Sequence, residues 1–142
     1  MKISSSLFVV LFLFSCEKPI SPFTINPVQV YTPTELSVQA TGSCDVTHLW
    51  EGKTVNVAGH IEALNLFSNK FWLYDTDGRG FVEIYYADPS AQSGRDIYEF
   101  AKANTGRAIT ITGLTVGNSM PTQSSCRKGL SITIANKTAI KF

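Results

Sequence analysis

The residues best suited to bind a ligand are aromatic and lie in one short stretch of the chain. Between positions 70 and 85, two runs of alternating residues flank an Asp-Gly pair. Nucleic-acid bases stack on exposed rings, and sugars present C–H faces to rings in a similar way. A carboxylate, an amine and an imidazole nearby would add hydrogen bonds. We therefore predict a ligand-binding face made of these residues: Trp72, Tyr74, Phe81, Tyr85, Lys70, Glu83 and His60.

Residues that could support catalysis or hold a metal are few. The sequence has two histidines, His48 and His60, and contains no nucleophile elbow, HExxH motif or phosphate-binding loop. The run DTDG at 75–78 resembles the opening of a calcium loop, but its twelfth position is Tyr86 instead of Glu. Cys44 and His48 have a metal-ligand spacing, yet no second close pair accompanies them. We expect no enzymatic activity, no metal site and no cofactor.

The rings can share one face only if their two strands pair in a particular register. Asp77-Gly78 is a strong hairpin signal and predicts a type I′ turn, with positive φ at both residues. A turn centred there pairs Trp72 with Glu83. A slip of one residue would exchange the two faces of the hairpin. In the predicted register the face opposite the rings is wholly apolar: Phe71, Leu73, Val82 and Ile84.

Three further segments have the two-residue period of half-buried strands, and they begin near Lys53, Ile109 and Leu130. A helix predicted over residues 94–105 separates the hairpin from the second of them. Gly113 lies where the apolar phase shifts by one residue, which indicates a bulge or a bend.

The order strand, strand, strand, helix, strand, strand resembles the OB-fold. Segments 52–59 and 107–113 look like its first and fourth strands, and the hairpin 71–84 looks like its second and third. The resemblance implies a mainly β fold, a small five-stranded OB-like Greek-key barrel with one helix between the third and fourth strands. In OB-folds the exposed face of the second and third strands commonly binds oligonucleotides or oligosaccharides. The predicted rings would lie on that face.

Residues 1–15 have the features of a signal peptide, because their apolar run, 7–14, is too short to cross a membrane as a helix. The sequence LFSC at 13–16 resembles the lipobox of bacterial lipoproteins, although Phe14 is larger than the residue usual there. The resemblance implies that Cys16 becomes the first mature residue and carries acyl chains such as palmitate, which would hold the protein on a membrane. The alternative is an ordinary secretory signal followed by a chance cysteine.

We predict two further parts after the signal peptide. Residues 16–43 form a proline-containing tether and N-terminal extension, and residues 44–142 form the barrel domain. If Cys16 carries lipid, Cys44 and Cys126 remain as an even pair, and we predict a disulfide between them in an oxidising compartment.

The charge balance bears on the class of ligand. The full chain has a formal net charge of +1, and removal of the signal peptide takes away Lys2. A neutral mature chain argues against nucleic acid, whose phosphates require several cationic contacts.

The sequence therefore predicts a non-catalytic lipoprotein of the cell envelope, periplasmic or surface-facing, whose ring-bearing face binds a glycan or a protein segment. A single-stranded nucleic-acid-binding OB-fold is one alternative. A structural or assembly subunit of an envelope complex, which could pair with a partner through a barrel edge, is another. It also remains open whether residues 17–48 cover the rings and make them a second small core.

Overall fold

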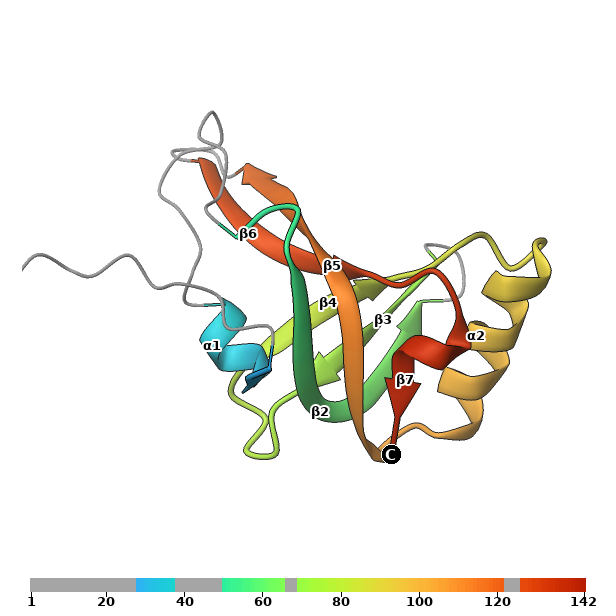
Figure 1. Cartoon of the computed structure of the whole chain (residues 1–142). Coiled ribbons are helices and arrows are strands. Elements are labelled where there is room, and N and C mark those ends of the chain that lie inside the picture. The colour runs from blue at the N-terminus through green and yellow to red at the C-terminus, as the bar shows by residue number, and fades with distance from the viewer. Residues whose placement is uncertain (1–27, 38–49, 66–68, 122–125) are drawn as a thin grey trace, which may run out of the picture.

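The computed structural model describes residues 28–37, 50–65, 69–121 and 126–142, without the side chains of 63–65, 119–121 and 126–128. Strands predominate, and helices interrupt them near the beginning, in the middle and near the end of the described chain (Figure 1). The elements are β1 (Val30–Tyr31), α1 (Pro33–Ser37), β2 (Thr54–Asn65), β3 (Lys70–Tyr74), β4 (Phe81–Tyr85), α2 (Gln92–Ala103), β5 (Ala108–Pro121), β6 (Cys126–Thr133), η1 (Lys137–Ala139) and β7 (Ile140–Lys141).

Five of the strands close into a barrel. Their order is β2-β3-β4-β6-β5, and β5 pairs back with β2 to complete the closure. All of these pairings are antiparallel except that between β4 and β6. The helix α2 lies between β4 and β5, the third and fourth barrel strands. The predicted mainly β, OB-like Greek-key barrel is confirmed. Strands β5 and β6 extend beyond the barrel as a two-stranded arm (Figure 1).

The core follows from the alternation of the strands. Every second residue of β2 from Val55 to Ile61 is buried, as the period of two predicts. The helix α2 adds Ile97 and Ala101 from one face, one helical turn apart. The fully buried side chains that fill the barrel include these: Val55, Val57, Ile61, Phe71, Leu73, Ile84, Ile97, Ile111 and Ile132.

The β3–β4 hairpin has the predicted register but a different turn. Trp72 lies opposite Glu83, and the apolar face points into the core. The predicted type I′ turn is wrong, because Gly78 has a positive φ of 69° whereas Asp77 does not. The amide of Gly78 donates to the carbonyl of Asp75 at 2.9 Å, so the loop is longer than two residues and uses glycine for its left-handed position.

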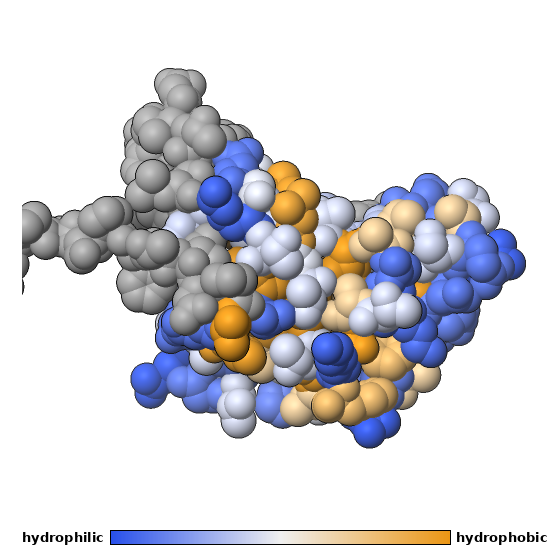
Figure 2. Space-filling model, in the orientation of Figure 1, coloured by the Kyte–Doolittle hydropathy of each residue, from blue (hydrophilic) through white to orange (hydrophobic). Residues whose placement is uncertain are grey.

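Strand β5 shows no bulge at Gly113. Its pairing with β2 continues in register from Asn56↔Thr112 through Val55↔Gly113. The buried phase of the strand also does not shift, since Gly113 and Thr115 are buried whereas the apolar Leu114 and Val116 are 47% and 37% exposed. On the face shown in Figure 2, hydrophobic residues form several small groups separated by polar ones.

Part of the described N-terminal segment packs against the barrel. Strand β1 pairs in parallel with β2. The ring centroids of Tyr31 and Trp50 lie 5.1 Å apart, and both side chains are buried. Leu36 of α1 is also buried, and α1 contacts β2, β4 and β6. Part of the segment predicted as an N-terminal extension therefore belongs to the core packing.

Asp75 fastens α1 to the β3–β4 hairpin. Its carboxylate accepts hydrogen bonds from the backbone amide of Thr34, at 3.1 Å, and from the Thr34 hydroxyl. Gly80 leaves room for this contact, because a Cβ there would lie only 2.8 Å from the Cα of Thr34. The hairpin turn and α1 are thus held together by one half-buried carboxylate.

We expect Asp75→Ala to lower the free energy of unfolding by about 2 kcal/mol, since hydrogen bonds to a charged group are lost. Urea denaturation of the purified protein measures this change. Asp77→Ala in the same turn is the matched control and should cost less than about 1 kcal/mol, because the exposed Asp77 pairs only with its neighbour Arg79. Equal losses in the two variants would contradict the role given to Asp75.

Candidate functional site

Three of the predicted rings form a cluster on the outer face of β3 and β4. The ring centroid of Phe81 lies 5.8 Å from that of Trp72 and 5.5 Å from that of Tyr74. Trp72 and Tyr74 are 6.2 Å apart and meet edge to face. The cluster exists because residues two apart on one strand share a face and Phe81 lies directly opposite Tyr74.

The rings of this cluster differ in exposure. Phe81 is 49% exposed, whereas Trp72 and Tyr74 are half-buried. His60 and Glu62 of β2 lie beside Tyr74 and Trp72 on the same face, as their pairing shows. Phe81 is therefore the ring most available to a ligand, and polar side chains border the cluster on the β2 side.

A polar cluster centred on Glu83 adjoins the rings. One carboxylate oxygen, Oε1, accepts from the Lys70 amine and from Trp72 Nε1 at 3.4 Å. The other, Oε2, accepts from the Tyr85 hydroxyl at 2.9 Å and from Asn118 Nδ2 at 3.2 Å. The Lys70 amine also lies 5.5 Å from the centroid of the Tyr85 ring. Both carboxylate oxygens are satisfied by protein donors, so Glu83 organises the side chains around it.

The ionisation of the cluster follows from these contacts. Burial acts to raise the pKa of Glu83, but hydrogen bonds from Lys70 and Tyr85, with the charge of Lys70, hold that pKa below its ordinary value. The hydrogen bond to Glu83 raises the pKa of the Lys70 amine, against the effect of burial. Burial and the neighbouring carboxylate raise the pKa of Tyr85. Lys70 and Glu83 therefore form a charged pair at neutral pH.

This pair predicts a pH-dependent stability. Because the folded-state pKa of Glu83 is lowered, its contribution is present above the ordinary carboxyl pKa of 4.5 and disappears as pH falls through the folded-state pKa. The contribution of Lys70 is present below its ordinary pKa of 10.5 and is lost at higher pH. We expect Glu83→Gln to be less stable than wild type at neutral pH and equally stable in acid. Urea denaturation from neutral to acidic pH measures the difference in free energy of unfolding between the two proteins. A difference that persists in acid would contradict the lowered pKa of Glu83.

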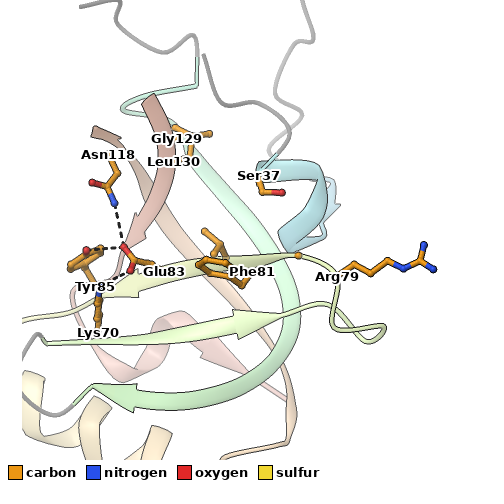
Figure 3. Close-up of a pocket in the computed structure, with 11 residues that line it drawn as sticks. Ser37, Lys70, Arg79, Phe81, Glu83, Tyr85, Asn118, Gly129 and Leu130 are labelled. Atoms are coloured by element: carbon orange, nitrogen blue, oxygen red, sulfur yellow. Dashed lines mark hydrogen bonds and ion pairs between the residues drawn. The ribbon is translucent and has the colours of Figure 1, made fainter. Parts of the chain in front are cut away.

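A groove opens beside Phe81 where β4 and β6 diverge. These two strands pair only at Ile84↔Ile132 and Tyr85↔Thr133, and the arm then carries β6 away from β4. The groove has a volume of about 540 Å³, within the range of ligand sites. In the groove, Phe81 lies between Ser37 of α1 and the Glu83 cluster (Figure 3). Residues of β6 form the wall of the groove that faces β4. The main lining residues of the groove are Ser37, Phe81, Val82, Glu83, Asn118 and Leu130.

The structure divides the predicted binding face into two adjoining parts. Trp72, Tyr74 and Phe81 form the ring cluster, while Tyr85 joins Lys70 and Glu83 in the polar cluster. His60 borders the ring cluster, and no hydrogen bond is found between its imidazole and another described side chain. Of the described N-terminal residues, Ser37 alone lines the groove.

The groove residues that the sequence did not predict as part of a site include Ser37, Asn118 and Leu130. Leu130 was expected only as a core residue of its strand, and Asn118 only as part of a polar loop. Nothing in the local pattern of either residue marks it as part of a site, because the groove arises from the divergence of strands distant in sequence.

Several predicted features lie outside the described residues. These include Cys16, Cys44 and His48, while Cys126 begins β6 without a described side chain. The predicted disulfide and the lipid attachment therefore stay predictions. Within the described ranges, no group of three or more metal-ligating side chains is found, and no helix is long and apolar enough to cross a membrane.

Comparison with known proteins supports the fold. No family model and no curated protein sequence matches the chain. Among solved structures, an OBody bound to hen egg-white lysozyme aligns with a TM-score of 0.50 at 14% identity, covering 78% of this chain and 91% of that one. A second OBody bound to lysozyme aligns with a TM-score of 0.48 at 17% identity, with the same coverage. At this identity the likeness shows a shared OB-type barrel and leaves the ligand open.

Proposed function

We propose that the protein is a non-catalytic lipoprotein of the cell envelope whose barrel binds a segment of a partner protein in the groove beside Phe81. The observation that carries the proposal is the half-exposed Phe81 ring, placed between apolar groove walls and the polar Glu83 cluster. A large exposed ring at the centre of a concave surface, with polar groups at its edge, is the usual make-up of a protein-binding hot spot.

A glycan is the second candidate, favoured by the contact of Phe81 with Trp72 and Tyr74 and by His60 and Glu62 beside them. A protein segment fits better for a geometric reason. The three rings are tilted against one another by 32° to 71°, and two of them are half-buried. The cluster therefore offers one exposed ring and a groove instead of a broad flat platform.

Nucleic acid fits less well, as the charge balance of the sequence predicts. The Lys70 amine is already paired with Glu83, and Arg79 lies beside Asp77. Among the described residues that line the groove, only the exposed Arg79 is then left to contact phosphates. The OBody that aligns with a TM-score of 0.50 is bound to a protein, hen egg-white lysozyme, so a barrel of this architecture can carry a protein-binding surface.

The lipoprotein part of the proposal rests on the sequence LFSC at 13–16 and the apolar run before it. Acylated Cys16 would anchor the barrel to a membrane through the proline-containing segment that follows. Incorporation of labelled palmitate into the wild-type protein, and its loss in Cys16→Ser, would support this anchoring. Equal labelling of both proteins, or of neither, would refute it.

The binding part can be tested by selection without knowledge of the natural partner. The wild-type protein is used to select from a random twelve-residue peptide library displayed on phage and is probed in parallel with a panel of envelope polysaccharide fragments. We expect enriched peptides whose binding to the purified protein is confirmed by titration calorimetry. Binding of glycans alone would favour the second candidate, and no binding in either arm would refute the proposal.

A further inference from the structure

The two edges of β4 are used unequally. On one side β4 pairs with β3 along its whole length, from Tyr74↔Phe81 to Lys70↔Tyr85. On the other side it pairs with β6 only at Ile84 and Tyr85. Residues 81–83 therefore have no strand partner on that side among the described elements, and consecutive β4 residues line the groove. The short helix α1 contacts both β4 and β6, so it bounds this gap at one end.

The direction of the backbone groups on this edge follows from the hairpin ladder. The amide of Asp75 donates to the carbonyl of Gly80 at 3.0 Å, which makes this opposing pair a hydrogen-bonded one. Hydrogen-bonded pairs alternate with non-hydrogen-bonded pairs in antiparallel strands. Val82 therefore bonds to β3, whereas the backbone groups of Phe81 and Glu83 point away from β3. The carbonyl of Tyr85, two residues further along, accepts from the amide of Ile134 at 3.0 Å and confirms this alternation.

The amides of Phe81 and Glu83 thus face the groove at the point where β6 has diverged. Among the described residues, no hydrogen bond to either amide is found. A strand edge with unsatisfied backbone groups is a template for another extended chain, which satisfies several of these groups at once. An extended chain carries acceptors at the same two-residue spacing as these two amides, which is the physical reason for preferring it here.

We infer that the partner segment binds as an added β-strand along residues 81–83 of β4, in the part of the gap between β4 and β6 that α1 leaves open as the groove. This inference rests on the proposed function and specifies the partner as an extended segment without proline at the paired positions. Side chains on alternate positions of such a strand point to the same face. One of them packs on the Phe81 ring, and an apolar residue is expected at that position.

Amide hydrogen exchange tests the inference directly. The probe is a peptide selected from the random library, added to the full chain at saturating concentration. We expect the exchange of the Phe81 and Glu83 amides to slow at least tenfold, whereas the Val82 amide, already bonded to β3, serves as the internal control. Equal exchange of Phe81 and Glu83 with and without bound peptide would overturn strand addition while leaving the proposed function intact.

A second measurement examines the same pairing from the side of the peptide. Peptide bonds of the selected sequence are N-methylated one at a time, which removes single backbone donors. Strand addition predicts loss of affinity at every second position, because alternate amides face β4. Loss without this period of two would overturn the inference. Failure to select any peptide would refute the proposed function and this inference together.

Discussion

Replacing Phe81 by alanine is expected to weaken the binding of library-selected peptides by about 30-fold or more. This corresponds to about 2 kcal/mol, the usual cost of truncating a central hot-spot residue. Phe81 combines 49% exposure with a place in the middle of the groove. Its truncation removes the largest accessible apolar surface there. Titration calorimetry of wild type and variant with the same peptide measures the effect.

Leu114→Ala is the matched control for this prediction. Leu114 is exposed to nearly the same extent, 47%, but lies on β5 and does not line the groove. Its removal should change affinity less than about twofold, since surface substitutions away from a site have small effects. Urea denaturation of both variants establishes that the barrel is intact. Comparable losses of affinity in the two variants would remove the groove as the binding site.

A large effect on stability is expected from Gly59→Ala, which should cost about 3 kcal/mol of unfolding free energy. Gly59 is buried in β2, and a Cβ there would overlap the carbonyl oxygen of Tyr74 and approach Leu73 Cγ to 2.9 Å. The carbonyl belongs to the paired strand β3 and cannot rotate away as a flexible side chain can. Insertion of a methyl group into such a site forces a backbone shift.

Gly106→Ala separates this clash from ordinary backbone strain. Gly106 has a positive φ of 82°, but a Cβ there meets nothing within 4 Å. We expect a loss of only about 1 kcal/mol from the left-handed conformation. Urea denaturation of both variants measures the difference. A Gly59→Ala protein as stable as Gly106→Ala would show that the two strands can separate at this point without cost.

The fold was predictable because each strand carries its own signal. In β3 and β4 every second residue is buried and apolar. Only one register places all of these residues on the same face of the hairpin, so the pairing of Trp72 with Glu83 could be predicted from the pattern. The helix was predictable from Ile97 and Ala101 at helical spacing. The turn type was not, because an Asp-Gly pair suits both a two-residue turn and a longer loop with glycine in the left-handed position.

The site was only partly predictable. Alternation placed Trp72, Tyr74 and Phe81 on one face, but their unequal exposure depends on how the rings pack on each other. The groove itself has no local signal. It needs β6 to diverge from β4 and α1 to close the opposite end, and these elements lie far apart in the chain.

Photocrosslinking in the cells that make the protein tests most directly whether the groove holds a partner segment. A p-benzoylphenylalanine replaces Ser37 on the α1 wall of the groove, and in a separate control it replaces Leu114. We predict a protein adduct at position 37 that maps to one short segment of the partner and is lost when Phe81→Ala is added. No adduct beyond that formed at position 114, or one that Phe81→Ala leaves unchanged, would contradict the account.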